Sequence, residues 1–355
     1  AVGITGGNPD AGLEVLKTLT PQQVEAAKAM LSIIQVDVKD VPDVLYAEVL
    51  AEADGHSARV VICTDHTRIV LLEKDGEVLM EQDSAPGVQI QPAKSDKPAM
   101  TLREIVAFAL EVPLTEIAFI REAASMNQAL ADEGLQGYGL RIGKILTEQV
   151  ERKLLSDDLM TLAMRLSSAA SDARMDGAML PAMSNSGSGN QGIAATMPVV
   201  AAARFLKADD EQLARALVMS HLVAIYIKAY QNKLSALCAA STAAMGSGAA
   251  ITWLLGGQFE QISHCINNMI GDVSGIICDG AGSACSMKVS TSTSAAVKSS
   301  LMAINNLHVP QSEGIVSDDV DQTIANLGRL SKQGMLDTDI EIINIMRAKQ
   351  QGKAG

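Results

Sequence analysis

Aromatic side chains and positive charge are both scarce in this sequence. Phe, Trp and Tyr make up only 3% of the residues, whereas Ala, Gly, Ser and Met are abundant, a composition that suits close helix packing rather than a β-sandwich. Lys and Arg total 28 against 41 for Asp and Glu, so the formal net charge is −13. Such a chain repels phosphate backbones and anionic lipid surfaces. We therefore expect neither nucleic acid nor membrane partners.

The motifs of several enzyme classes are also missing. The sequence contains no glycine pattern for dinucleotides, no phosphate-binding loop and no serine-hydrolase elbow. No basic segment followed by a hydrophobic run and a cleavage site opens the chain, which indicates a cytoplasmic protein. In that compartment the five cysteines stay reduced, and they bind metal or do chemistry more often than they form disulfides.

The first part of the sequence combines helix and strand signals. The opening residues Ala1–Gly7 read like the end of an element already under way, so we expect an amino-terminal segment before them. A capping box at Thr20–Gln23 predicts a helix that runs to about Ile34. Four β-rich runs then predict an antiparallel meander, with Asp75-Gly76 as a hairpin turn. These runs are Val44–Leu50, Arg59–Cys63, Thr67–Leu72 and Val78–Glu81.

The second part is dominated by helical periodicity from a capping box at Thr101–Glu104 to about Ala348. We predict an α+β protein. A small antiparallel-sheet domain with flanking helices covers residues 1–98, and a large all-α domain that binds cluster and substrate covers residues 99–355. The polar, proline-containing residues 84–98 are expected to be a surface connection. The predicted helices are Leu102–Val112, Thr115–Glu133, Ile142–Leu154, Asp157–Ala169, Ala194–Phe205, Asp209–Tyr230, Leu234–Leu255, Glu260–Ile277, Met287–Asn305, Asp318–Leu330 and Asp337–Arg347.

One of these segments is long enough to raise the question of a membrane span. Leu234–Leu255 carries no charged residue and has about the length that crosses a bilayer. Most of its residues are Ala, Ser, Thr or Gly, which give weak transfer energy but allow close helix contact. We expect a helix buried inside a bundle.

The first break in the helical pattern is the serine–glycine segment Ser184–Gly192. It leads into a helix, so backbone N–H groups and hydroxyls lie beside a positive helix end. A flexible connector has the same composition. However, Ser171–Arg174 upstream and Thr196–Pro198 downstream belong to core helices, which linkers between domains rarely interrupt. We expect a substrate carboxylate to bind this segment at Ser186, Gly187, Ser188, Gly189 and Asn190.

The second break separates Cys278 from Cys285. On a continuous helix these residues would lie about 10 Å apart along the axis, too far for one compact cluster. Gly280 and Gly282 let the chain double back. Cys238 lies in the uncharged segment forty residues before Cys278, and a third thiolate can approach from there. Free cysteines are also commonly small buried hydrophobes, so this spacing leaves a core role open.

Three thiolates suit an iron–sulfur cluster. A 4Fe–4S cluster with three cysteine ligands leaves one iron without a protein ligand, and that iron can polarise a substrate as a Lewis acid. Structural zinc is the competing interpretation. It normally uses closely paired ligands in two short motifs, and the sequence has no such pairing.

The remaining candidates carry less weight. His66 joins two predicted strands, where an exposed imidazole can exchange protons, although isolated histidines at strand ends are usually ordinary surface groups. His221, His264 and Cys265 fall inside helical patterns, so we expect satisfied packing positions. The seventeen methionines are interpreted as core residues.

At these residues the sequence resembles the L-cysteine desulfidase family, an uncharacterised UPF0597-type family related to the alpha chain of the iron–sulfur L-serine dehydratase. The resemblance covers essentially the whole chain. The stretches that carry it are Gly12–Lys17, Ser168–Met175, Ser184–Gly192, Leu234–Cys238 and Gly271–Gly280.

The resemblance implies a carbon–sulfur lyase of cysteine catabolism. Its reaction would convert L-cysteine to pyruvate, ammonia and sulfide without pyridoxal phosphate. It would use a 4Fe–4S cluster held by the residues that correspond to Cys238, Cys278 and Cys285. The partner is then a small amino-acid substrate, and a homo-oligomer remains open. The alternatives are an iron–sulfur L-serine dehydratase and a metal-free protein of the same fold that binds a small carboxylate or has a regulatory function.

Two departures from the family pattern matter. The family places its proposed catalytic base on a cysteine in a Gly-Cys-Thr-Glu-Pro motif, which this sequence does not contain, so the catalytic residue is unknown. Serine dehydratases carry a cluster cysteine in the loop that here reads Gly189–Gly192. Asn190 replaces that ligand, which favours the desulfidase over the dehydratase.

Overall fold

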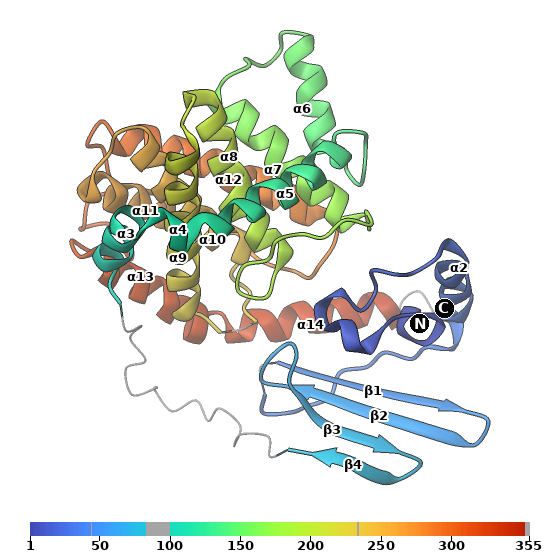
Figure 1. Cartoon of the computed structure of the whole chain (residues 1–355). Coiled ribbons are helices and arrows are strands. Elements are labelled where there is room, and N and C mark those ends of the chain that lie inside the picture. Colours follow the sequence, from blue (N-terminus) through green and yellow to red (C-terminus); the bar gives the residue numbers. More distant parts are fainter. Residues whose placement is uncertain (44, 83–99, 233, 352–355) are drawn as a thin grey trace. The chain divides into compact units, whose positions relative to one another are not determined.

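The computed structural model describes residues 1–43, 45–82, 100–232 and 234–351 (Figure 1). The chain divides into two compact units: Ala1–Ser95 together with Ile345–Gly355, and Asp96–Asn344. We call them the amino-terminal unit and the helical unit. A small antiparallel sheet and many helices confirm the α+β class. The predicted boundary between residues 98 and 99 and the connection over residues 84–98 lie outside the described residues, so the two-domain division stays a prediction.

The sheet of the amino-terminal unit is the predicted meander. Its order is β1-β2-β3-β4, and each neighbouring pair is antiparallel. Asp75 and Gly76 both have positive φ, 52° and 81°, as a two-residue type I′ hairpin turn requires. Asp54 and Gly55 form the same turn earlier in the sheet. The strands are β1 (Tyr46–Ala53), β2 (His56–Cys63), β3 (Ile69–Lys74) and β4 (Glu77–Glu81).

The helices that precede the sheet are short. Thr20 and Gln23 form the predicted capping box, but α2 ends at Ala29 and only a 3₁₀ turn continues to Ile33. The Thr5 hydroxyl donates to the Gln23 carbonyl at 2.9 Å and ties the first helix to the second. These elements are α1 (Val2–Thr5), η1 (Pro9–Glu14), α2 (Pro21–Ala29) and η2 (Met30–Ile33).

The helical unit contains the predicted helices, with several changed ends. The predicted helix over Thr115–Glu133 is broken into α4, a 3₁₀ turn and α5. Thr101 and Glu104 form the predicted capping box of α3. The elements are α3 (Leu102–Glu111), α4 (Leu114–Ile117), η3 (Ala118–Ile120), α5 (Arg121–Gly134), α6 (Ile142–Glu151), α7 (Leu159–Met175), α8 (Gly189–Leu206), α9 (Asp210–Ala229), α10 (Ala239–Leu254), α11 (Phe259–Val273), α12 (Ala284–Ala303), α13 (Val320–Arg329), η4 (Leu330–Gly334) and α14 (Leu336–Gln351). The residues of α14 from Ile345 onward belong to the amino-terminal unit.

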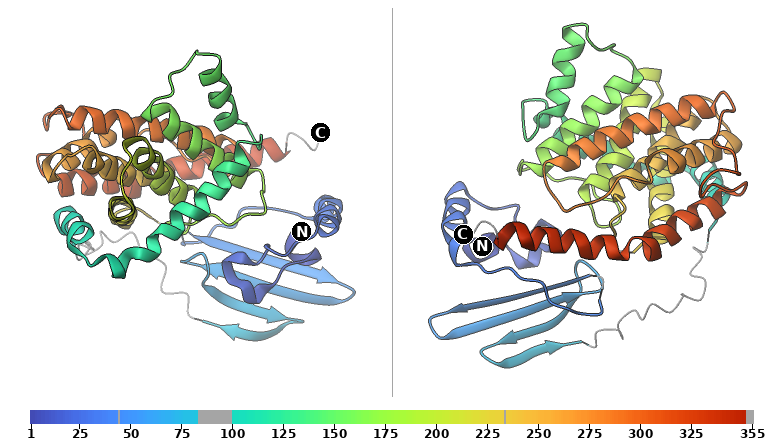
Figure 2. Two further views of the ribbon diagram at one scale, coloured as in Figure 1. Left: turned by 45° about the horizontal axis from the view of Figure 1, so that its top comes forward. Right: turned by 180° about the vertical axis from the view of Figure 1, so that it is seen from behind.

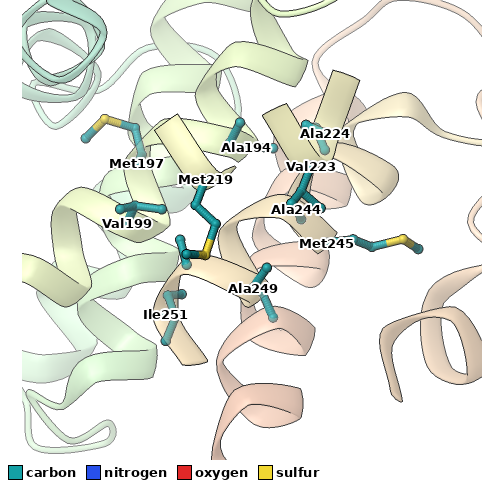
Figure 3. Packing of buried hydrophobic residues seen from close by; sticks show 14 of the residues in the cluster. Ala194, Met197, Val199, Met219, Val223, Ala224, Ala244, Met245, Ala249 and Ile251 are labelled. Atoms are coloured by element: carbon teal, nitrogen blue, oxygen red, sulfur yellow. The ribbon is translucent and has the colours of Figure 1, made fainter. Parts of the chain in front are cut away.

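The core of the helical unit lies where α8, α9 and α10 pack together (Figure 3). Alanine and methionine side chains from the three helices interlock there. A Cβ added at Gly246 of α10 would lie 2.1 Å from the Ser220 carbonyl oxygen of α9, so these two backbones are in close contact. Both views of Figure 2 show α6 projecting away from the other helices of this unit.

The uncharged segment forms the centre of this core. Every residue of α10 from Ala240 to Thr252 is buried, as expected for a bundle helix rich in small residues. None of the helices in the described ranges is long and apolar enough to cross a membrane.

Candidate functional site

Two candidate metal ligands, Cys238 and Cys278, meet at a short antiparallel bridge. Leu237 pairs with Ile277. Main-chain hydrogen bonds flank this pair, one donated by the Cys238 N–H at 2.9 Å and one by the Cys278 N–H at 2.7 Å. Because side chains alternate across a two-stranded ladder, both cysteines project from the same face, with Cβ atoms roughly 7 Å apart. The fold therefore brings together two thiols that are distant in sequence.

The bridge changes the position predicted for Cys238. We expected a helix over Leu234–Leu255 with Cys238 inside it, but α10 begins at Ala239 and Cys238 is its N-cap in an extended conformation. Pairing with the segment around Ile277 uses main-chain groups that a helix would need for itself. The thiol therefore lies at the amino-terminal end of α10.

Cys285 lies in the first turn of α12, after the glycine-containing turn. Gly280 has a φ of 110°, a conformation that side chains rarely adopt. The Cys285 Sγ lies 3.8 Å from the Gly280 carbonyl oxygen, and the Cys285 N–H donates to the Gly282 carbonyl at 3.0 Å. The chain thus turns at Gly280 between Cys278 and Cys285, whereas a positive φ is absent at Gly282.

The charges of the three thiols are coupled. Burial raises the pKa of the Cys278 thiol, and negative charge on Cys238 and Cys285 raises it further. The Gly280 N–H and the Lys288 ammonium group act in the opposite direction. Cys278 is therefore within electrostatic range of both other thiols, on the order of 10 Å. Lys288 pairs with Asp279 and supplies positive charge to this group.

The three thiols are chemically suitable ligands for an iron–sulfur cluster, but their side chains do not yet converge on one point. Within the described ranges, no three His, Cys, Asp or Glu side chains are grouped so that they could hold a metal ion as they stand. Cys278 and Cys285 are partly exposed, and a Cβ at Gly282 would meet no atom within 4 Å, so their turn borders open space. Three thiols beside positive groups are suitable ligands for such a cluster, provided that the turn or the side chains shift.

The serine–glycine segment forms a tight turn followed directly by α8. Asn185 and Ser188 exchange main-chain hydrogen bonds of 3.1 and 3.0 Å, and Ser186 and Gly187 have φ values of 49° and 85°. Positive φ at Ser186 is unfavourable for a residue with a side chain, and such strain is common at functional sites. The loop is shorter than predicted, because the helix begins at Gly189.

The start of α8 has the features of an anion site. Ser188 is its N-cap, and no side-chain hydrogen bond caps the helix, so the first N–H groups have no capping acceptor even though Gly189 and Asn190 are buried. The Asn190 side chain is buried. It accepts a hydrogen bond from the Ser171 hydroxyl at 3.1 Å and donates to the Met175 sulfur at 3.2 Å. Of the predicted substrate-binding residues, Asn190 is thus held by α7.

Arg174 connects the loop with the cysteines. It lies in the last turn of α7 and donates to the Met175 sulfur at 3.1 Å. A Cβ at Gly189 would lie 2.2 Å from Arg174 Nε, so the arginine rests on the first residue of α8. Burial lowers the pKa of the Arg174 guanidinium, and negative charge on Cys285 opposes this shift. Arg174 therefore contacts the start of α8 and lies within electrostatic range of Cys285.

Asp172 links α7 to α6. Its carboxylate is 1% exposed and accepts the Ile142 N–H at 2.7 Å and the Gly143 N–H at 3.4 Å. Asp172 thus caps α6, whose own N-cap residue has no capping side chain. Burial raises the pKa of Asp172, whereas main-chain N–H groups and the nearby Ser286 side chain lower it. The Ser286 hydroxyl itself donates to the Ser283 carbonyl at 2.6 Å, and Asp172 Oδ1 has no hydrogen-bond partner among the described residues.

His221 holds the serine–glycine turn from the other side. Its Nδ1 lies 3.1 Å from the Asn185 amide nitrogen, and its Nε2 lies 2.9 Å from the Thr196 hydroxyl. Since the amide must donate to Nδ1, the neutral ring carries its proton on Nε2. Burial lowers the pKa of His221 to about 4. The Ser186 hydroxyl also donates to the Asn185 side chain at 2.8 Å, which ties the turn to this network.

The other weaker candidates lie apart from these contacts. His66 is exposed, and Cys265 is fully buried beside Ser300, both as expected. The expectation for His264 was wrong in part. Its ring stacks on His308 with 4.0 Å between centroids, but its buried Nδ1 has no hydrogen-bond partner among the described residues.

The sequence interpretation assigned no function to Arg174 or Asp172 and only a packing position to His221. The signal available for the first two was a charged pair inside the otherwise small and apolar stretch Ser168–Met175. Charged residues at core positions need partners, which indicates either an ion pair or a ligand. For His221 the sequence offered no such signal, because its partners come from the distant segment around Asn185.

Comparison with known proteins identifies the family. A family model described as the serine dehydratase alpha chain matches residues 10–344. The chain belongs to this family.

Several relatives within it are called UPF0597 proteins. The chain is 94% identical over 354 residues to one from Aeromonas salmonicida, and this match covers 100% of the chain and 81% of the relative. It is 54% identical to one from Shewanella pealeana, over 98% of this chain and 82% of the relative. It is 51% identical to one from Chromobacterium violaceum, over 99% of this chain and 82% of the relative. The resemblance inferred from the sequence is therefore confirmed at the level of the family.

Gly192, in the first turn of α8, should be essential for the position of the serine–glycine turn in this serine dehydratase-like fold. A Cβ at Gly192 would lie 1.8 Å from the Met183 carbonyl oxygen, in the main chain that enters the turn. We expect Gly192→Ala to lower the free energy of unfolding by about 2 kcal/mol through overpacking, despite the better helix propensity of alanine. Denaturant unfolding followed by the fluorescence of Trp253 measures this. Gly275→Ala is the control, because its Cβ would meet no atom within 4 Å; equal stability of the two variants would contradict the prediction.

Proposed function

We propose that the chain is a carbon–sulfur lyase, an L-cysteine desulfidase that forms pyruvate, ammonia and sulfide with a 4Fe–4S cluster held by Cys238, Cys278 and Cys285. The observation that carries this proposal is the pairing of Leu237 with Ile277, which places the adjacent residues Cys238 and Cys278 on one face of the bridge. The electrostatic effect of Cys285 on Cys278 adds to it. Membership of the serine dehydratase alpha chain family supports lyase chemistry on an amino acid.

The residues of the chain would have separate tasks. When bound, the cluster supplies a Lewis acid at an iron that no protein side chain ligates. Lys288 favours the deprotonated form of the Cys278 thiol, the form that ligates metal. The Ser186–Asn190 segment would bind the substrate carboxylate through the N–H groups at the start of α8, which no side chain caps, and the Ser188 hydroxyl. We assign no residue of the chain as the acceptor of the α-proton.

An iron–sulfur L-serine dehydratase is the second candidate, because the matching family model carries that description. The environment of Asn190 argues against it. Its side-chain amide is buried and engaged by Ser171 and Met175, and an amide cannot supply the thiolate that the resemblance to serine dehydratases places there. The desulfidase therefore agrees better with this loop.

The substrates can be compared directly. We expect the natural full-length polypeptide, reconstituted anaerobically with iron and sulfide, to show a broad visible iron–sulfur absorption band and to release sulfide from L-cysteine. Pyruvate formation from L-serine under the same conditions should be much slower. A preference for L-serine would replace the proposal by the dehydratase. Protein that takes up no iron on reconstitution would leave a metal-free function in small-carboxylate binding or regulation.

A further inference from the structure

Arg174 is a partly buried cation that has no anionic partner among the described residues. Within the same ranges its one hydrogen bond goes to the Met175 sulfur, and no carboxylate forms an ion pair with it. A guanidinium presents five donors, and partial removal from water is unfavourable when they have no acceptor. The chain also has an excess of acidic residues, so an unpaired arginine next to a candidate site is informative.

The groups around Arg174 indicate which kind of ligand it would bind. Its Nε lies against Gly189 at the uncapped start of α8, where a Cβ would lie 2.2 Å from it. The charge of Cys285 also acts on the guanidinium. A ligand that contacts Arg174 would thus lie beside the start of α8 and within electrostatic range of the Cys285 thiol.

We propose that Arg174 binds the α-carboxylate of the substrate and so orients the amino acid between the serine–glycine turn and the three cysteines. The inference rests on the proposed function, because it takes an amino acid as the ligand. An arginine fork matches a carboxylate in two parallel hydrogen bonds, which fixes the plane of the ligand as well as its position. A net charge of −13 repels a free carboxylate, so recognition needs a local positive group of this kind.

A different role would also account for a cation here. Arg174 could stabilise only the negative charge of the cysteine thiolates, through Cys285. In that case the loss of Arg174 would reduce the iron content of the protein and would weaken the binding of all ligands equally. Recognition of a carboxylate, in contrast, affects only ligands that carry one.

Two probes separate the two roles. 3-Mercaptopropionate has a thiol and a carboxylate but no amine, whereas cysteamine has a thiol and an amine but no carboxylate. Calorimetric titration of both probes into the reconstituted wild-type protein, Arg174→Gln and Arg174→Lys measures the carboxylate contribution without turnover. Arg204→Gln is the matched control, since Arg204 is an exposed arginine at the other end of α8.

We expect Arg174→Gln to weaken the binding of 3-mercaptopropionate by about 100-fold, the usual effect of losing hydrogen bonds to a charged group, and to change cysteamine binding little. Arg174→Lys should recover part of the loss, and KM for L-cysteine should rise more than kcat falls. Iron content and visible spectrum should match the wild type. Arg204→Gln should bind both probes normally.

The inference would be overturned by equal weakening of both probes, by unchanged binding in Arg174→Gln, by loss of iron in both Arg174 variants, or by a wild type that binds neither probe. Failure of the proposed reaction has a different signature. A wild-type protein that releases no sulfide from L-cysteine, but whose affinity for 3-mercaptopropionate depends on Arg174, would remove the desulfidase activity and leave carboxylate binding at Arg174 intact.

Discussion

Cys278→Ala should lower sulfide release from L-cysteine by about 1,000-fold or more and should remove most of the bound iron and its visible absorption. The factor corresponds to the several kcal/mol that a Lewis-acid metal contributes to a reaction. Cys278 is the thiol whose charge couples to both others, so its loss would leave two ligands on separate helix starts. Iron and sulfide assays on anaerobically reconstituted protein measure both effects.

The matched control is Cys63→Ala. Cys63 is also a buried free thiol, but it lies in β2 of the sheet and belongs to the small cluster with Val61 and Val70. This variant should keep its iron and its turnover. Cys238→Ala and Cys285→Ala should behave like Cys278→Ala. Full iron content in any of these three variants would show that the altered thiol is not a ligand.

The second large effect concerns His221 and the pH dependence of stability. Burial lowers the pKa of this imidazole from 6.5 to about 4. As pH falls below about 6.5, the unfolded chain binds the proton while the folded protein does not, so stability that is present above pH 6.5 is lost progressively down to about pH 4. The linkage amounts to about 3 kcal/mol.

His221→Gln should remove this contribution. Urea unfolding between pH 7 and pH 4, followed by the fluorescence of Trp253 in α10, should show a shallower loss of stability in the variant than in the wild type. At pH 7 the variant should be less stable, because Asn185 and Thr196 lose their hydrogen-bond partner. His66→Gln is the control, since His66 is exposed. Equal pH dependence in His221→Gln and the wild type would contradict the account.

Local sequence signals were sufficient for much of the fold. Two capping boxes and the Asp75-Gly76 turn predicted helix starts and a hairpin that the structure contains. These features depend on neighbours within a few residues, so the sequence carries them directly. The break of the predicted helix Thr115–Glu133 into two helices and a 3₁₀ turn had no such signal.

Long-range contacts explain the remaining differences. The helix α10 begins at Ala239 and not at the predicted Leu234, because the preceding segment pairs with residues near Ile277. Tertiary pairing here overrides helix propensity. For the site, the glycines between Cys278 and Cys285 indicated a turn. The approach of Cys238 to that turn was a hypothesis that only the fold could examine. Arg174 next to Gly189 follows from the packing of α7 on α8, which no local pattern encodes.

The most direct measurement of the central claim is Mössbauer spectroscopy of the anaerobically reconstituted, ⁵⁷Fe-labelled protein. Three protein thiols on one 4Fe–4S cluster predict that one iron in four is distinct and that its signal alone changes when L-cysteine is added. The Cys238→Ala protein should lack the cluster spectrum. Four equivalent iron sites that ignore L-cysteine, or an intact spectrum in Cys238→Ala, would contradict the claim that Cys238, Cys278 and Cys285 hold the same cluster.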